Sequence, residues 1–327
     1  MNTDEKIISA FKTGQFPQAG KDLPKHIVTA ISNVFVFADR AYKIYKGDND
    51  FFNKNLNDLS AKDNRFSFTK KDFEWNNQLS PEVYLEIKGI YLKEDKVTFG
   101  NADAAADALV IIMKSIDMND SLINRLMANT ISMDDCYKIG FQFGEREGDL
   151  PEEQIARSVH DDFVSRYNDV VPWIASAEKH IGKDEIKLYV SHLQKSIEDT
   201  TEIFKSNADM SFCLDIHADN VVFSNGVFLP IDTFSPKADW RYGYKFLNIY
   251  RLATDIYVFL GKECFENTLQ GYQDATHQVV PRKLDTFLIL YSELISCPYQ
   301  YMLAEKDPSR LPVAEKCRLF LKGLISG

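Results

Sequence analysis

The 327-residue sequence predicts an α+β fold built from two parts. The pattern changes near residues 114–120: strand-like runs dominate before this point and helical periodicity dominates after it. The apolar fraction, 45%, suits a folded chain long enough to form a core in each part. No internal repeat or low-complexity segment is evident. We therefore assign residues 1–116 to a small, strand-rich N-terminal part and residues 117–327 to a larger, helical part.

Strands and one helix account for the N-terminal part. Residues 33–46, NVFVFADRAYKIYK, contain two β-rich runs around Ala38–Asp39 and predict a hairpin. A helix follows, and Ser80–Pro81 ends it. The residues at helical spacing on its face are Phe68, Asp72, Trp75 and Leu79. Residues 81–92 and 96–100 predict two further strands, and DALVIIMK predicts a buried strand.

Helical patterns dominate the C-terminal part. Residues 122–127, 134–143 and 152–171 suit helices, and residues 246–260 suit another that Gly261 ends. An apolar stripe predicts one long amphipathic helix in between. The stripe consists of Ile186, Tyr189, Leu193, Ile197 and Phe204.

Composition excludes several classes of protein. The net charge of −10 offers no basic stripe for nucleic-acid phosphates. Five scattered cysteines argue against a disulfide framework or a zinc knuckle and suit reduced thiols in a cytoplasm. The N-terminus lacks the basic and apolar regions of a signal peptide. The longest apolar runs are too short to span a bilayer. We expect a cytoplasmic protein with no nucleic-acid or membrane partner.

The stretch CLDIHADNVVFSNGVFLPID, residues 213–232, carries the candidate chemistry. Two apolar runs flank Asn225–Gly226, a pair suited to a type I′ hairpin turn. A tight hairpin would return the chain to its start and bring Asn220 close to Asp232, with Asp215 nearby. Three oxygen-bearing side chains in one small site suit Mg²⁺, which takes one or two protein oxygens and leaves the rest to water and phosphates.

The residue types suggest a division of roles in phosphoryl transfer, which depends on positioning and charge neutralisation. Asp215 would orient a substrate hydroxyl and accept its proton. Asn220 would be a neutral metal ligand that adds no repulsion. Asp232 would hold the metal on the β- and γ-phosphates of a nucleotide.

This stretch resembles the catalytic and metal-binding loops of the protein-kinase-like superfamily. The resemblance lies in the pattern D-x-x-x-x-N, followed by a short hairpin and then by I-D. DIHADNVVF is most similar to the D-L-H-x-x-N-V pattern of aminoglycoside phosphotransferases and choline-kinase-like enzymes. Two segments of the N-terminal part resemble the N-terminal part of bacterial bifunctional aminoglycoside phosphotransferase/ATP-binding proteins. These segments are AYKIYK, residues 41–46, and WNNQLSPEVYL, residues 75–85. The match covers about residues 30–90 and 210–260. It implies a two-lobed protein-kinase-like fold with ATP and Mg²⁺ in the cleft between the lobes.

The resemblance assigns nucleotide-binding roles in the N-terminal lobe. Lys43 takes the place of the lysine that contacts the α- and β-phosphates. Asp72 is its expected ion-pair partner, and Glu74 is the alternative. ALVIIMK becomes the hinge strand that bonds the adenine edge. The nearest candidates for that contact are Met113 and Lys114, and Ser32 with Asn33 would form the phosphate loop.

The sequence departs from the family in two places. Cys213–Leu214 stands where the family has His-Gly, and the lost histidine normally braces the metal loop. Residues 233–235 read Thr-Phe-Ser, where the bacterial branch often has Cys, Ile and Glu. No G-x-x-x-x-G-K-[ST] motif is present, so the second half of the bifunctional proteins is absent. Two further polar residues have structural explanations: His217 bonding within its own loop, and Asp255 as a buried brace for that loop.

These observations together predict an ATP- and Mg²⁺-dependent kinase acting on a hydroxyl of a small molecule. The acidic stretch GEREGDLPEE, residues 144–153, is compatible with a cationic acceptor such as an aminoglycoside or an amino alcohol. The alternative is a pseudokinase, a nucleotide-binding or regulatory module, which the Cys213–Leu214 departure motivates. A Ser/Thr protein kinase ranks last because no A-P-E segment follows Asp232.

Overall fold

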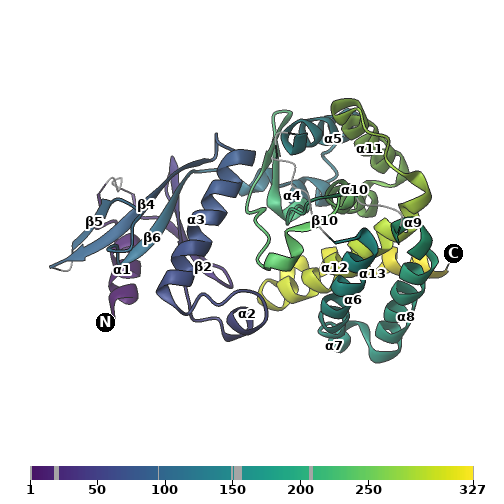
Figure 1. The fold of residues 1–327 in the computed structure, drawn as a ribbon. Coiled ribbons are helices and arrows are strands. Elements are labelled where there is room, and N and C mark those ends of the chain that lie inside the picture. Colours follow the sequence, from purple (N-terminus) through teal and green to yellow (C-terminus); the bar gives the residue numbers. More distant parts are fainter. Residues whose placement is uncertain are drawn as a thin grey trace. The chain divides into compact units, whose positions relative to one another are not determined.

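The computed structural model describes residues 2–17, 22–94, 96–148, 150, 157–205 and 209–326 (Figure 1). The chain divides into two compact units. Unit 1 comprises Met1–Met118 and Leu229–Ala238, and unit 2 comprises Asn119–Phe228 and Asp239–Gly327. Residues 229–238 therefore group with the N-terminal strands, although the sequence analysis assigned them to the C-terminal part.

Unit 1 is built on a six-stranded antiparallel sheet with the strand order β1-β2-β3-β6-β4-β5. The strands are β1 (Lys25–Val28), β2 (Ser32–Val36), β3 (Arg40–Tyr45), β4 (Tyr84–Lys93), β5 (Lys96–Gly100) and β6 (Ala108–Lys114). The hairpin predicted over residues 33–46 is confirmed as β2–β3. The predicted buried strand is confirmed as β6, which lies between β3 and β4. It packs on both faces, which explains its unbroken apolar run.

Helices lie against both faces of this sheet. They are α1 (Thr3–Lys12), α2 (Asp50–Asn55) and α3 (Lys62–Leu79). Tyr42 and Ile44 of β3 pack in one core cluster with α1, whereas Tyr45 packs in a second cluster with Phe68 of α3. Because side chains alternate along a strand, Lys43 shares the α3 face with Tyr45. The sequence of β3 thus directs a lysine into the core between the sheet and α3.

Unit 2 is mostly helical, as the sequence predicts (Figure 1). Its helices are α4 (Leu122–Met127), α5 (Met133–Gly148), α6 (Val159–Ala175), α7 (Glu178–Ile181), α8 (Lys183–Asp199), α9 (Thr201–Lys205), α10 (Leu247–Leu260), α11 (Lys262–Thr276), α12 (Asp285–Lys306) and α13 (Leu311–Ser326). Two short strands, β7 (Met210–Phe212) and β10 (Tyr242–Tyr244), pair with each other. No helix in the described ranges is long and apolar enough to cross a membrane.

Two helix predictions are wrong in their extent. The single long helix predicted through Phe204 is two helices, α8 and α9, separated at Thr200. The Thr200 hydroxyl donates to the carbonyl oxygen of Ser196 at 2.8 Å and shares this acceptor with the Thr200 backbone N–H. The helix predicted from residue 152 begins at Val159, because Ser158 caps its N-terminus. Residues 152–156 of that prediction lie outside the described residues.

Two turn predictions are confirmed. Strands β8 (Val221–Ser224) and β9 (Val227–Pro230) form the predicted hairpin. Its turn residues, Asn225 and Gly226, have φ angles of 52° and 78°, and two positive values are what a type I′ turn requires. Gly261, with a φ of 90°, ends α10 as expected.

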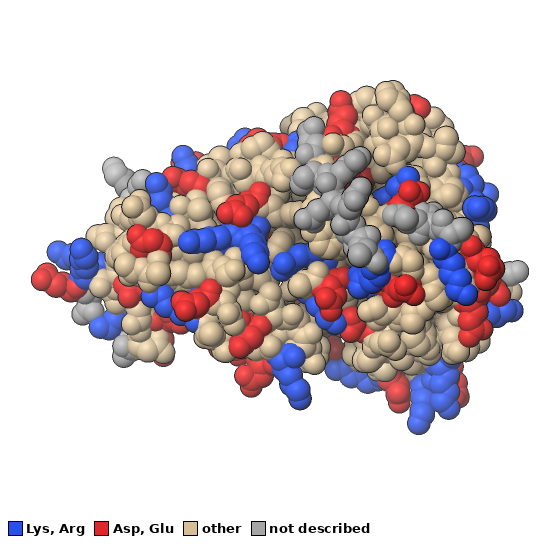
Figure 2. Space-filling model, viewed as in Figure 1, with Lys and Arg blue, Asp and Glu red and all other residues tan. Residues whose placement is uncertain are grey.

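The surface carries both signs of charge. On the face shown in Figure 2, Lys and Arg lie among Asp and Glu rather than in one continuous basic area.

Helices α5 and α11 approach each other closely because glycines lie at their contact. A Cβ atom on Gly140 would lie 1.9 Å from the carbonyl oxygen of Thr268, and one on Gly271 would lie 2.1 Å from that of Tyr137. These backbone atoms cannot move without separating the two helices.

We predict that Gly140→Ala lowers the free energy of unfolding by roughly 1–3 kcal/mol because the added methyl group overpacks this contact. Gly323→Ala in α13 is the matched control, since a Cβ atom there meets nothing within 4 Å. It should stabilise the protein by roughly 0.5–1 kcal/mol through helix propensity. Urea denaturation of both variants measures the difference, and equal effects would contradict the close helix contact.

Candidate active site

A buried ion-pair network in unit 1 centres on Lys43. Its side chain is 6% exposed, and its Nζ lies 3.5 Å from Oδ2 of Asp72 and 2.5 Å from Oδ1 of Asp232. Asp72 lies on α3 and is 1% exposed, whereas Glu74 is exposed on the same helix. The structure thus brings Lys43 together with Asp72, the partner that the sequence analysis preferred, and with Asp232.

The charges of this network depend on one another. Burial alone would lower the pKa of Lys43, but the carboxylates of Asp232 and Asp72 raise it above its ordinary value. Lys43 is therefore an ammonium ion at neutral pH. Burial raises the pKa of Asp72, and the neighbouring Lys43 ammonium opposes that rise. The Asp232 side chain is 57% exposed, so this carboxylate combines contact with Lys43 and access from solvent.

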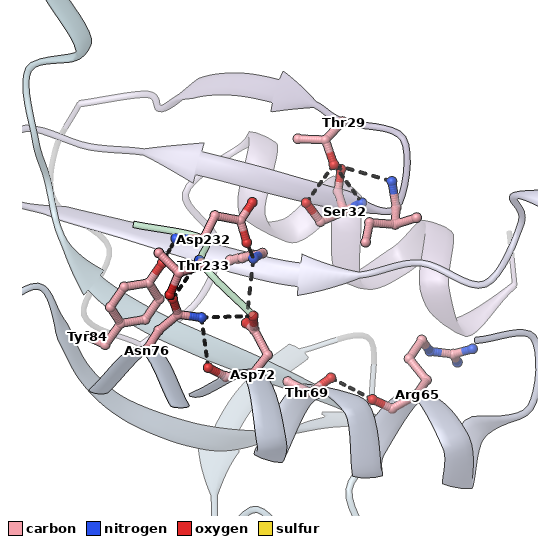
Figure 3. A network of polar contacts seen from close by, with 11 residues as sticks. Thr29, Ser32, Arg65, Thr69, Asp72, Asn76, Tyr84, Asp232 and Thr233 are labelled. Carbon is pink, nitrogen blue, oxygen red and sulfur yellow. Dashed lines mark hydrogen bonds and ion pairs between the residues drawn. The ribbon is translucent and has the colours of Figure 1, made fainter. Parts of the chain in front are cut away.

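The chain around Asp232 bonds to α3 and β4. Figure 3 shows Asn76 and Tyr84 directed toward Asp232 and Thr233. Asp232 itself has a φ of 54°, in the left-handed region that non-glycine residues rarely adopt. Phe234 then packs on the ring of Phe68, with ring centroids 5.3 Å apart. These contacts explain why residues 229–238 belong to unit 1.

The predicted phosphate loop is an ordered polar turn. The backbone N–H of Ser32 donates to the Thr29 hydroxyl at 2.9 Å, and the two hydroxyl oxygens lie 2.8 Å apart. Ser32 is buried at 1% exposure, and the Asn33 amide oxygen lies 2.9 Å from Nε2 of His26. The Ser32 hydroxyl is therefore engaged within its own turn, and its phosphate-binding role stays a prediction.

The predicted hinge residues lie inside the sheet. Met113 is in register with Ala41 of β3 and with Tyr84 of β4. The backbone N–H of Lys114 donates to the carbonyl oxygen of Val83 at 2.8 Å. A role for these residues in binding adenine stays a prediction, and the Lys114 N–H is already used.

The catalytic-loop candidates lie together in unit 2. A 3-10 turn, Ala218–Asn220, places the Asn220 side chain beside Asp215, and Asn220 Nδ2 donates to the Asp215 carbonyl oxygen at 2.8 Å. The Asp215 side chain is 36% exposed, and its Oδ1 lies 3.2 Å from Nη1 of Arg251. Asn220 belongs to unit 2 and Asp232 to unit 1, so their predicted proximity stays a prediction.

Two polar side chains of helix α10 form hydrogen bonds with the backbone of this loop. Asn248 accepts the backbone N–H of Leu214 at 2.9 Å and donates to the carbonyl oxygen of Phe212 at 2.8 Å. Asp255, the predicted brace, accepts the backbone N–H of Ala218 at 2.7 Å. Both are buried. The sequence analysis missed Asn248 and Arg251, although their spacing of seven and four residues before Asp255 places all three on one face of the helix.

Two further residues of the loop are buried. His217 lies between Asp215 and Asp219, at 3.9 and 3.7 Å. Burial alone would lower its pKa, but the bond to Asp219 and the nearby Asp215 raise it. Burial raises the pKa of the Cys213 thiol to about 11, so this side chain is neutral. The Cys213 sulfur lies close to Gly243: a Cβ atom added to Gly243 would lie 2.5 Å from this sulfur. The contacts of His217 with Asp215 and Asp219 lie within its own loop, as the sequence analysis expected.

Solved structures show what fold these features belong to. No protein-family model and no curated protein matches the sequence. A glucosamine kinase in complex with glucosamine, ADP and inorganic phosphate is similar with a TM-score of 0.54 at 11% identity, over 93% of this chain and 80% of that one.

Two other similar structures have lower TM-scores. A choline/ethanolamine kinase family protein from Mesorhizobium loti has a TM-score of 0.49 at 10% identity, over 98% of this chain and 95% of that one. The ADP-bound aminoglycoside phosphotransferase APH(2'')-Ib has a TM-score of 0.46 at 14% identity, over 99% and 97%. The likeness to the glucosamine kinase shows that this chain has the protein-kinase-like fold, with a β-sheet unit and a helical unit.

A partly buried carboxyl group on α5 makes the stability of the folded protein depend on pH. Glu147 Oε1 accepts from Nδ2 of Asn248 at 2.6 Å, and Oε2 accepts from the Tyr272 hydroxyl at 2.7 Å. Burial raises the pKa of Glu147 from 4.5 to about 7, although both hydrogen bonds oppose the rise. The folded state therefore binds this proton more tightly than the unfolded state does. The resulting stabilisation is complete below pH 4.5 and is lost as the pH rises through 7.

We predict that wild-type protein loses stability relative to Glu147→Gln as the pH rises from 4.5 to 7, because glutamine imitates the neutral carboxyl group. The slope of the difference should not exceed about 1.4 kcal/mol per pH unit. Urea denaturation of both proteins at several pH values measures it. Parallel profiles for the two proteins would contradict the raised pKa.

Proposed function

We propose that this chain is a small-molecule kinase that transfers the γ-phosphate of ATP, with Mg²⁺, to a hydroxyl group. The observation that carries the proposal is the buried Lys43 ammonium paired with Asp72 and Asp232. A lysine fixed in this way is suited to contact nucleotide phosphates. The similar glucosamine kinase was solved with ADP, phosphate and an amino sugar, which supports the same class of reaction here.

The unit 1 residues fit a nucleotide and a metal ion held together. Asp72 would hold Lys43 in place while the ammonium contacts the phosphates. The partly exposed Asp232 carboxylate is a hard oxygen ligand. Within the described part of the chain, no three His, Cys, Asp or Glu side chains form a group that could hold a metal by themselves. Such a sparse donor set suits Mg²⁺, which keeps water and shares phosphate oxygens. When bound, Mg²⁺ would neutralise the charge of the β- and γ-phosphates.

The unit 2 residues supply the acceptor chemistry. Asp215 would accept the proton of the acceptor hydroxyl. At the same time the oxygen of that hydroxyl would form a bond to the γ-phosphorus, and the bond between the γ-phosphorus and ADP would break. The contact with Arg251 and the loop bonds to Asn248 and Asp255 fix the position of Asp215. Asn220, which bonds to the Asp215 backbone, would be the neutral metal ligand. The base and this ligand would therefore be placed by one short loop.

Three classes of small molecule are candidates for the acceptor. Amino sugars, aminoglycosides and amino alcohols all carry a hydroxyl group beside a cationic nitrogen. In the stretch 144–153, Glu147 is engaged with Asn248 and Tyr272, whereas Glu145 is exposed, so a role of this stretch in binding a cationic acceptor stays a prediction. Residues 149 and 151–153 of the same stretch lie outside the described residues. The proposal therefore stops at a small molecule with a phosphorylatable hydroxyl group.

The pseudokinase alternative rested on the replacement of His-Gly by Cys213–Leu214. In this structure the loop is braced by Asn248 and Asp255, and Leu214 contributes its backbone N–H to that support. A brace built from other residues favours an adapted site over a decayed one. The alternative stays open as an outcome of the following experiment.

The test follows label from γ-³²P-ATP and Mg²⁺ into a metabolite extract supplemented with glucosamine and choline. We predict a labelled small product with wild-type protein and at least a 100-fold lower rate with Asp215→Asn, because the proton acceptor is lost. Asp199→Asn, at an exposed position of α8, is the matched control and should retain the activity. Equal labelling with Asp215→Asn would exclude the proposed base. Binding of Mg·ATP without any labelled product would favour the pseudokinase.

A further inference from the structure

The segment WNNQLSPEVYL, residues 75–85, joins α3 to β4 and directs three polar side chains at one short piece of chain. Asn76, Ser80 and Tyr84 bond to residues 230–233, more than 140 positions further along the sequence. All three are at most 2% exposed. Neither the ion pair of Lys43 nor the transfer step uses them directly.

The three side chains bind consecutive parts of the backbone around Asp232. Figure 3 shows Asn76 and Tyr84 directed at this backbone. The Ser80 hydroxyl donates to the carbonyl oxygen of Pro230 at 2.7 Å. The Tyr84 hydroxyl oxygen accepts the backbone N–H of Asp232 at 2.7 Å. The Asn76 amide oxygen accepts the backbone N–H of Thr233 at 2.9 Å and its hydroxyl at 3.0 Å. The backbone is thus held before, at and after Asp232.

The conformation of Asp232 explains why such support is needed. Its φ of 54° places it in the left-handed region, which is unfavourable for a residue with a Cβ atom. Such a conformation persists when the surroundings determine it strongly. Its side chain is largely exposed, so burial of the carboxylate does not fix it. The hydrogen bonds of the neighbouring backbone therefore act together with the ion pair to Lys43 in setting its direction.

Asn76 also connects Asp72 of the ion-pair network with Thr233, the residue that follows Asp232. Its Nδ2 donates to Oδ1 of Asp72 at 3.0 Å and to the backbone carbonyl oxygen of Asp72 at 2.9 Å. Its amide oxygen bonds to Thr233, the residue after Asp232. One amide group therefore relates the position of Asp72 to that of Asp232.

We infer that Asn76, Ser80 and Tyr84 are positioning residues that hold Asp232 in the conformation in which its carboxylate binds the metal. The set of these three side chains is called the clamp below. The inference rests on the proposed role of Asp232 as a metal ligand. It also assigns a purpose to the motif LSPEVYL, because Ser80 bonds to the backbone at Pro230 and Tyr84 bonds to the backbone at Asp232.

The first experiment compares Tyr84→Phe with Tyr42→Phe. Both tyrosines are 2% exposed, but Tyr42 packs in the core cluster around α1, on the other face of the sheet. Calorimetric titration measures ADP affinity with Mg²⁺ and with EDTA. We expect Tyr84→Phe to reduce the Mg²⁺-dependent gain in affinity about fivefold, the effect of one hydrogen bond, and to leave metal-free affinity unchanged. Tyr42→Phe should change neither value. Equal losses with and without Mg²⁺ would overturn the inference.

A double-mutant cycle shows whether Tyr84 acts through Asp232. In an Asp232→Asn background, Tyr84→Phe should cause no further loss of Mg²⁺-dependent affinity, since the carboxylate that it positions is gone. An additive, fivefold further loss would show that the hydroxyl acts on something else and would overturn the inference.

Amide hydrogen exchange tests the clamp without any nucleotide. The Asp232 amide should exchange faster in Tyr84→Phe than in wild-type protein or in Tyr42→Phe, because it loses its acceptor. Unchanged exchange would overturn the inference whatever the titrations show. Faster exchange in a protein that binds no ADP would support the clamp and count against the proposed function, so the two failures can be told apart.

Discussion

The Lys43 ammonium lies in the core of unit 1, with carboxylate oxygens of Asp72 and Asp232 at 3.5 and 2.5 Å. An unpaired charge in such a place would be strongly destabilising, so both carboxylates must be kept near it. They come from α3 and from a segment nearly 160 residues further along the chain. The requirement therefore joins the sheet, its helix and residues 229–238 into one unit. Because removing one partner of such a network leaves a buried charge, function and stability are linked at Lys43.

The clamp and the α10 support follow the same principle in the two units. In each, buried amide, hydroxyl or carboxyl groups bond to the backbone of a functional segment and leave its acidic side chain accessible. Asn76, Ser80 and Tyr84 do this for Asp232, and Asn248 and Asp255 do it for the loop of Asp215. Backbone bonds of this kind fix the direction of a side chain without consuming its oxygens. The departure at Cys213–Leu214 is compatible with this arrangement, since the bonds to the loop come from α10.

Local patterns in the sequence predicted much of the fold and part of the site. Helical spacing places Asp72 rather than Glu74 on the buried face, whereas Lys43 was assigned only through the family resemblance. The turn at Asn225–Gly226 and the helix end at Gly261 follow from backbone chemistry that single residues determine. Asp215 and Asn220, five positions apart, lie in one loop, where Asn220 Nδ2 donates to the carbonyl oxygen of Asp215.

Contacts between distant segments were harder to predict. Nothing local in the sequence pairs Tyr84 with Asp232 or Asn76 with Thr233, because these bonds depend on tertiary packing. The predicted continuous helix through Phe204 is divided at Thr200, whose hydroxyl and backbone N–H both donate to the carbonyl oxygen of Ser196. The roles of Ser32 and Met113 depend on which of their polar groups the fold leaves available, and that is decided by neighbours such as Thr29 and Tyr84.

The central claim is that Lys43, Asp232, Asp215 and Asn220 act on one Mg²⁺-bound nucleotide. A crystal structure with Mg²⁺ and a non-hydrolysable ATP analogue tests it most directly. The account predicts Lys43 Nζ within hydrogen-bond distance of phosphate oxygens, Mg²⁺ coordinated by Asp232 and Asn220, and Asp215 facing the γ-phosphate without coordinating the metal. A nucleotide bound away from Lys43, or a metal held by other residues, would contradict it.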